Sequence, residues 1–235
     1  MKKHLTLFVL LTSTLAGYAQ CTNPFYTMEE GRYFEVENYN GKDKLQAKVL
    51  YTITDVSETA DGYEATLNSK TLDKKGKELA AGDMVVMCDD GLLKMDIQRM
   101  LNGMKQLQNT EGMEVDIEGD HLVIPASLSV GDVLPESTTT ITMKVDGTNV
   151  GMTTMDFAIK NRTVAAQEEL TTSAGTFSCY KITYDMDMDV KVMGMGRTTQ
   201  LSGTEWIAEG VGMVRNEQYD KNGKLNSYSV LTSLE

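Results

Sequence analysis

The sequence predicts an all-β fold: a single antiparallel sheet, strongly curved into a half-barrel or open-barrel meander, with one inserted amphipathic helix at about residues 96–108. The first observation is an alternation of apolar and polar residues with period two, which is typical of strands with one buried and one solvated face. The second is the turn chemistry between these runs. The third is a helical period that occurs only once.

The first element, residues 1–19, has the features of a secretory signal peptide. Lys2 and Lys3 give a positive start, a short apolar run follows, and Gly17 and Ala19 place small side chains at the cleavage positions. The apolar run is too short to span a bilayer. We therefore expect export to the periplasm or the extracellular side of a bacterial envelope, with cleavage after Ala19.

The mature chain, residues 20–235, is interpreted as one β-rich domain. Segments 37–45, 71–79 and 218–225 each pass from a strand through a Gly-Lys pair to a leucine, which indicates one turn chemistry used three times. Asn-Gly pairs in the first and third of these tolerate positive φ. Period-two alternation places the following residues on common faces: Leu45, Ala47, Val49, Tyr51 and Ile53; Tyr63, Ala65 and Leu67; Ile141, Met143 and Val145.

The inserted helix is predicted from apolar residues at helical spacing. Asp96 stands where it would cap the start, and the pattern ends near Asn109. An apolar stripe on a helix needs a partner surface, and we expect the concave face of the sheet to supply it. The stripe consists of Ile97, Met100, Leu101, Met104 and Leu107.

Composition excludes several classes of partner. The whole chain has a net charge of −12, and removal of Lys2 and Lys3 with the signal peptide makes it −14. Nucleic acid would be repelled, because its binding depends on neutralising phosphates with Lys and Arg. The mature chain shows no run long enough for a membrane helix and no cofactor motif, so we expect no transmembrane segment and no cofactor.

Three cysteines remain after cleavage. In an exported protein we expect one disulfide among Cys21, Cys88 and Cys179, and the spacing does not select the pair. Gln20 stands where a lipoprotein signal usually has a small residue, so we expect no lipid on Cys21.

Candidates for metal binding and catalysis have simpler explanations. The methionines in DMDMDVKVMGMG are soft ligands that suit Cu(I), and the aspartates between them could bind Ca²⁺. An amphipathic strand with flexible side chains inside and a solvated acidic face explains both, so we expect no metal site. His121 is the only histidine of the mature chain and lies beside no nucleophile motif, so we expect no catalytic residue.

A possible groove for a ligand or partner is the densest surface of methionine and aromatic side chains. Methionine is common at adaptable binding surfaces because its thioether is flexible. The alternative is that these side chains seal a closed core. The groove residues are Trp206, Tyr180, Tyr184, Met186 and Met188 from the strands and Met100 and Met104 from the predicted helix.

Four segments together carry a family resemblance: CTNPFYTMEEGRYFEVENYNGKDKL, MCDDGLLKMDIQRML, GTFSCYKITYD and EWIAEGVGMVRNEQYDKNGKLNSYSVLTSL. They cover nearly the whole mature chain in order, and the chain thereby resembles the exported TapB-like family of domains of unknown function. The resemblance implies a YmcC-like fold, a strongly curved open barrel, and a role in the envelope. It also implies association with a tetratricopeptide-repeat protein, and no catalytic residue.

Two functions from different classes follow. The first is a non-catalytic binding or assembly module of the envelope, which holds an apolar or glycan ligand or docks to a repeat protein. The second is an enzyme that acts on envelope glycans through paired carboxylates, for which Asp116, Glu118 and Asp120 near His121 are the best cluster. Charge alternation in a short hairpin explains these carboxylates more simply, so we expect the first.

Overall fold

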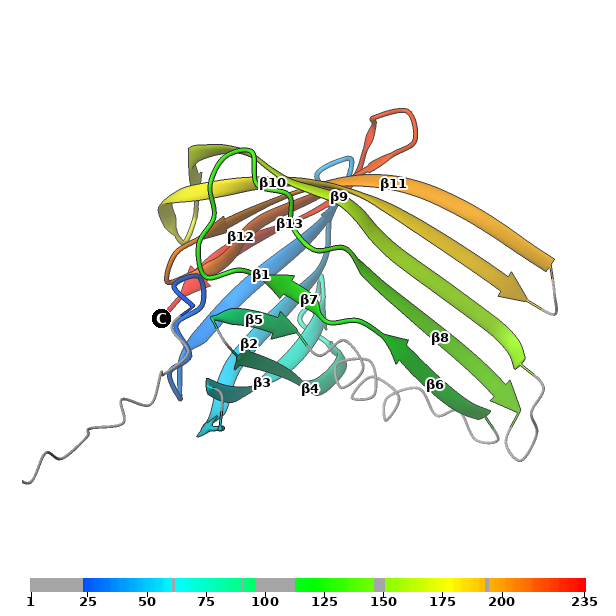
Figure 1. The fold of residues 1–235 in the computed structure, drawn as a ribbon, viewed down its shortest axis with the longest axis horizontal. Coiled ribbons are helices and arrows are strands. Elements are labelled where there is room, and N and C mark those ends of the chain that lie inside the picture. The colour runs from blue at the N-terminus through cyan, green and yellow to red at the C-terminus, as the bar shows by residue number, and fades with distance from the viewer. Residues whose placement is uncertain (1–22, 61, 90, 96–112, 146–150, 193–194) are drawn as a thin grey trace, which may run out of the picture.

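The computed structural model describes residues 23–60, 62–89, 91–95, 113–145, 151–192 and 195–235. Within them, all helix or strand structure is β, in one antiparallel sheet of thirteen strands (Figure 1). The prediction of an all-β, antiparallel and open fold is confirmed. The strands are β1 Tyr33–Asn40, β2 Leu45–Glu58, β3 Gly62–Asp73, β4 Glu78–Asp89, β5 Leu92–Met95, β6 Met113–Gly119, β7 Leu122–Ile124, β8 Ser137–Val145, β9 Gly151–Thr172, β10 Gly175–Val192, β11 Met195–Ala208, β12 Gly212–Asp220 and β13 Leu225–Leu234.

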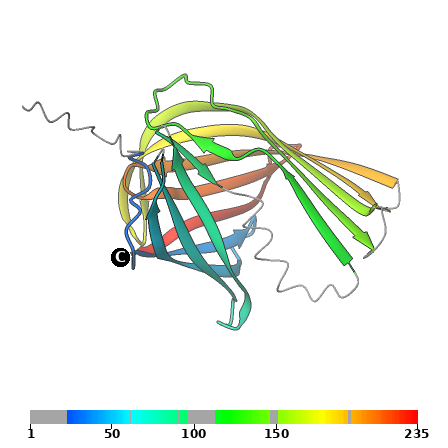
Figure 2. The ribbon, with the colours of Figure 1, turned by 60° about the horizontal axis from the view of Figure 1, so that its bottom comes forward.

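The strand order explains the curvature of the sheet. It runs β6-β8-β9-β10-β11-β12-β13-β1-β2-β3-β4-β5-β7, so two meanders are joined where β13 pairs with β1. The edge strands β6 and β7 are separated in sequence only by Asp120 and His121. Because so short a connection cannot span a large distance, the sheet must curl until its two edges meet. Strands β8 to β11 run on past the part formed by β1 to β5, which leaves the barrel open there (Figures 1 and 2).

The segment between β7 and β8 covers the seam where the two edges meet. Its backbone pairs with β9: Leu134 N–H donates to Arg162 O at 2.8 Å, and Val133 forms an isolated bridge with Thr163. Leu128 and Leu134 of the same segment are buried. This segment therefore supplies the backbone pairing with β9 up to the point where β8 begins.

The prediction of an inserted helix at about 96–108 is wrong for the architecture that is observed. The described part of the chain contains no helix, and residues 96–112 lie outside it, including Met100 and Met104. The reason lies in what fills the concave side of the sheet. Phe25 of the N-terminal arm, together with Leu128 and Leu134, packs there against residues of the strands, so the core that the described residues form contains no helix.

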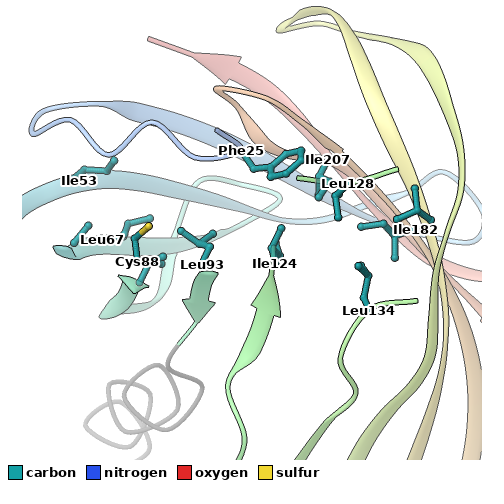
Figure 3. Close-up of a cluster of buried hydrophobic side chains, with 13 residues drawn as sticks. Phe25, Ile53, Leu67, Cys88, Leu93, Ile124, Leu128, Leu134, Ile182 and Ile207 are labelled. Atoms are coloured by element: carbon teal, nitrogen blue, oxygen red, sulfur yellow. The ribbon is translucent and has the colours of Figure 1, made fainter. Parts of the chain in front are cut away.

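The main core lies between the curled strands β2 to β5 and the facing strands β9 to β11 (Figure 3). Apolar side chains from both parts of the sheet meet inside the barrel. The buried members are Phe25, Ile53, Ala65, Leu67, Val86, Cys88, Leu93, Ile124, Leu128, Leu134, Val164, Ile182 and Ile207.

The prediction that one turn chemistry is used three times is confirmed. In each turn a side-chain oxygen at the first position, Asn40, Asp73 or Asp220, accepts hydrogen bonds from the backbone N–H groups two and four residues later. The fourth position has positive φ in all three. In the first turn that position is Asp43 rather than a glycine, so the expectation that the Asn40-Gly41 pair provides the positive φ is wrong for this turn.

Candidate functional site

A cavity of about 480 Å³ opens inside the barrel beside the core. This volume falls within the roughly 300–1,000 Å³ typical of small-molecule sites. The lining comes from both parts of the sheet and from the N-terminal arm. It consists of Tyr26, Phe34, Val36, Tyr51, Leu67, Met84, Val86, Met95, Leu122, Ile159, Arg162, Tyr184, Glu205, Val211, Met213, Asn216 and Gln218.

Strands β1 to β5 supply an apolar wall. Phe34 of β1 stacks on Tyr51 of β2, with ring centroids 4.7 Å apart and an interplanar angle of 17°. Met84 on β4 and Met95 on β5 extend this wall. The period-two alternation of these strands predicts such a face, since every second side chain points inward.

The opposite wall carries a buried arginine. Arg162 on β9 is 1% exposed, and its Nη1 donates to the carbonyl oxygens of Val123 and Pro135, both at 2.9 Å. Its Nη2 is buried without a hydrogen-bond partner. The guanidinium therefore ties the edge strand β7 to the segment before β8 and keeps one donor unused.

A bulge in β9 turns Arg162 inward. Asn161 has φ of 54°, and the pairing of β9 with β10 shifts register at this point. The extra residue shifts the alternation of inward and outward side chains by one position. Ile159 before the bulge and Arg162 after it therefore both line the cavity. Asn tolerates this left-handed conformation better than most residues.

A carboxyl group lies across the cavity from the apolar wall. Glu205 on β11 is 8% exposed, and burial raises the pKa of its carboxyl group, while the charge of Arg162 partly opposes this rise. In the described part of the chain the two side chains line the same cavity without forming an ion pair. The cavity thus contains a buried cation and a buried carboxyl group that form no hydrogen bond with each other.

Tyr184 and Asn216 complete the polar wall. Asn216 Nδ2 donates to the Tyr184 hydroxyl at 2.9 Å, and burial raises the pKa of that hydroxyl. The Tyr184 ring crosses the neighbouring strand at Gly203, where a side chain would collide with it. Gly203 therefore lets the ring lie flat on the inner face.

The structure separates the residues of the predicted groove. Tyr184 lines the cavity, while Tyr180 packs on the core with its ring edge-on to Phe25 at 5.8 Å and 78°. Met186 and Met188 share the face of Tyr184 farther along β10 and are half-buried. Met100 and Met104 lie outside the described residues.

Trp206 belongs to a different cluster from the cavity. It is adjacent to Glu205 on β11 and points to the other face, where it packs with Cys179, Ala208 and Val214. Its Nε1 donates to Glu168 Oε1 at 2.6 Å, and Lys181 Nζ lies 5.2 Å from its ring centroid. The structure therefore does not bring Trp206 together with Tyr184.

The cysteines and the acidic cluster lie apart from the cavity lining. Cys88 is disulfide-bonded, Cys179 is free and buried, and Cys21 lies outside the described residues. In the acidic cluster Asp116 pairs with Lys144, Glu118 is exposed, and Asp120 Oδ2 accepts from Thr138 Oγ1 at 2.9 Å. Among the described residues, no group of three His, Cys, Asp or Glu side chains could hold a metal ion.

Sequence reasoning did not find Arg162 and Glu205. Arg162 lies between Asn161 and Thr163, which indicate a solvated strand face. Glu205 precedes Trp206, which indicates an ordinary position at the rim of the barrel. The one available signal is Asn161, because an Asn before an Arg within an otherwise alternating run is compatible with a bulge.

Comparison with known proteins places this architecture in a family. The family model described as DUF3108-like matches residues 29–231. The chain belongs to the DUF3108-like family. No curated protein matches it. Across the residues that the structure describes, no helix is long and apolar enough to cross a membrane.

Two solved structures are similar over their whole length to this DUF3108-like chain. One, from Bacteroides fragilis, is described as an exported protein with a YmcC-like fold; it has 27% identity, a TM-score of 0.69, and covers 91% of this chain and 100% of its own. The other, from Parabacteroides distasonis, is described as a lipoprotein; it has 30% identity, a TM-score of 0.73, and covers 92% of this chain and 100% of its own.

Proposed function

We propose that this protein is an exported, non-catalytic binding module of the bacterial envelope that holds a small apolar ligand in the cavity of its barrel. The observation that carries the proposal is the cavity itself: about 480 Å³, largely apolar on one side, with a few polar groups gathered on the other. Concave sites of this composition are typical of small-molecule binding. Many hydrogen-bonding groups would be needed to hold a glycan, so the lining favours an apolar ligand.

The proposed compartment rests on sequence and on relatives. Residues 1–19 predict export, and the two similar structures are described as an exported protein and a lipoprotein. A periplasmic location and membership of the TapB-like group, with docking to a repeat protein, stay predictions. Against the enzyme alternative stands the position of the carboxylates Asp116, Glu118 and Asp120, which are absent from the cavity lining.

A neutral apolar dye tests the proposal. The mature chain should bind N-phenyl-1-naphthylamine saturably with one site per molecule, seen as a rise in dye fluorescence. Met84→Trp puts a large ring into the cavity and should weaken dye binding by about tenfold or more, equivalent to about 1.4 kcal/mol. Leu79→Trp is the matched control, because Leu79 lies on the same strand and is 57% exposed.

Two results would contradict this function. The first is the absence of saturable dye binding by the folded protein. The second is dye binding by Met84→Trp that equals that of Leu79→Trp, since the dye would then sit outside the cavity.

A further inference from the structure

The polar wall of the cavity contains an unusual pair of buried groups. Arg162 keeps an unpartnered Nη2, and the carboxyl group of Glu205 accepts no hydrogen bond from the described residues. Buried polar groups normally have partners, and a buried charge without one is costly. Since the two side chains line the same cavity without touching, a bound group between them would satisfy both.

The chemistry of such a group follows from its two neighbours. The guanidinium can only donate hydrogen bonds, and an ionised carboxylate can only accept them. A group between them must therefore accept on one side and donate on the other. A carboxylic acid does both, with its carbonyl oxygen and its hydroxyl.

We propose that the cavity binds a medium- or long-chain carboxylic acid, with its carboxyl group accepting a hydrogen bond from Arg162 Nη2 and sharing one proton with Glu205. This inference rests on the proposed function and names its ligand class. The hydrocarbon chain lies against the apolar wall formed by β1 to β5, with Phe34, Tyr51 and Met84 among its contacts.

The charges of the complex balance. Arg162 contributes one positive charge, and two carboxyl groups that share one proton contribute one negative charge, so the filled cavity is neutral. The other titratable groups that line it are Tyr26 on the N-terminal arm, Tyr51 on β2 and Tyr184 on β10. Burial raises the pKa of all three hydroxyls, so they stay neutral at ordinary pH.

Proton sharing gives the binding a characteristic pH dependence. At a pH where the free ligand and Glu205 are both ionised, binding takes up one proton from solution. The affinity should then fall about tenfold for each unit of pH increase. A ligand held by apolar contacts alone would show no such fall.

Displacement of the neutral dye by two ligands measures this directly in the unmodified protein. Dodecanoic acid should displace the dye at pH 7 at least about tenfold more effectively than methyl dodecanoate, which cannot donate a hydrogen bond. Once the pH exceeds the raised pKa of Glu205, the affinity for the acid should fall about tenfold per unit, while that for the ester stays constant.

Two variants separate the roles of the side chains. Glu205→Gln can donate its amide N–H to an ionised carboxylate, so it should remove the fall with pH. Arg162→Met should abolish the preference for acid over ester, and Arg197→Met, an exposed arginine on β11, should keep it. Because Arg162 also holds Val123 and Pro135, circular dichroism must first show that its variant is folded.

These experiments distinguish failure of the carboxylic-acid proposal from failure of the proposed binding function. Equal displacement by acid and ester, or retention of that preference in Arg162→Met, would overturn the carboxylic-acid assignment even when the dye binds. Failure of the dye to bind would overturn the proposed function itself.

Discussion

Replacing Gly203 with alanine should destabilise the protein by an amount that follows from the geometry. Gly203 is paired with Tyr184 on the adjacent strand, and a β-carbon at Gly203 would lie 2.1 Å from Cζ of the tyrosine ring and 2.4 Å from its hydroxyl oxygen. The ring must move, and its hydrogen bond from Asn216 is then lost. Overpacking costs about 1–3 kcal/mol and the lost hydrogen bond about 1 kcal/mol, so we expect a total of about 2–4 kcal/mol.

Urea denaturation of the mature chain, followed by circular dichroism, measures this loss. The matched control is Gly196→Ala on the same strand, where the new β-carbon meets the flexible side chain of Lys191 at 3.3 Å and lies in ordinary contact with Val190 O at 3.9 Å. That control should lose little stability, because alanine also reduces the entropy of the unfolded chain. Combining Gly203→Ala with Tyr184→Ala should cost much less than the two single changes together, since they share one contact. Equal stability of the Gly203→Ala and Gly196→Ala proteins would refute the reasoning.

Two further predictions concern the smaller cluster around Trp206. Trp206→Phe should lose about 2–3 kcal/mol in urea denaturation, because the smaller ring leaves part of the buried site empty and cannot donate the hydrogen bond that Trp206 gives to the half-exposed Glu168; Glu168→Gln, which keeps an acceptor, should lose less. Burial raises the pKa of Cys179 to about 11, so the folded protein holds this thiol proton more tightly than the unfolded chain does. The contribution of Cys179 to stability should therefore decline as pH rises from about 8.5 towards 11. Iodoacetamide at pH 8 should therefore modify Cys179 slowly in the folded protein and quickly in urea, and equal rates would contradict its burial.

Local patterns predicted the sheet and one wall of the cavity. Alternation along β2 placed Tyr51 and Ile53 on one inner face, and turn residues marked three hairpins that the structure contains. These features depend on neighbours in sequence, which a pattern can describe. The pattern also predicts that Tyr184 lines a groove. This prediction could be made because β10 pairs with β11 without a bulge, so its alternation of inward and outward side chains is regular.

The polar wall was not predictable in the same way. Arg162 reaches the cavity only because a bulge at Asn161 changes the phase of β9, and alternation read without that bulge assigns the wrong face. Trp206 was grouped with Tyr184 although the two residues point to opposite faces of neighbouring strands. The partner of a strand face is decided by how the whole sheet curls, and the residues of one strand do not contain that information.

The helix prediction failed for a related reason. An apolar stripe at helical spacing indicates a helix that needs a partner surface, and in an otherwise all-β sequence the concave face of the sheet is the expected partner. In the structure, Phe25, Leu128 and Leu134 reach that face from segments without regular periodicity. Segments without regular structure have no periodic pattern from which burial of their side chains can be predicted.

The incomplete barrel has a consequence for how the protein behaves among copies of itself. β6 pairs only with β8, so the backbone groups on its other side have no partner strand in the described structure. Such an edge can recruit a second chain and start aggregation. Along β6 the sequence MEVDIEG places an acidic residue at every second position, Glu114, Asp116 and Glu118. A second copy of this edge would bring like charges together, so these carboxylates, two of which belong to the predicted acidic cluster, disfavour edge-to-edge assembly.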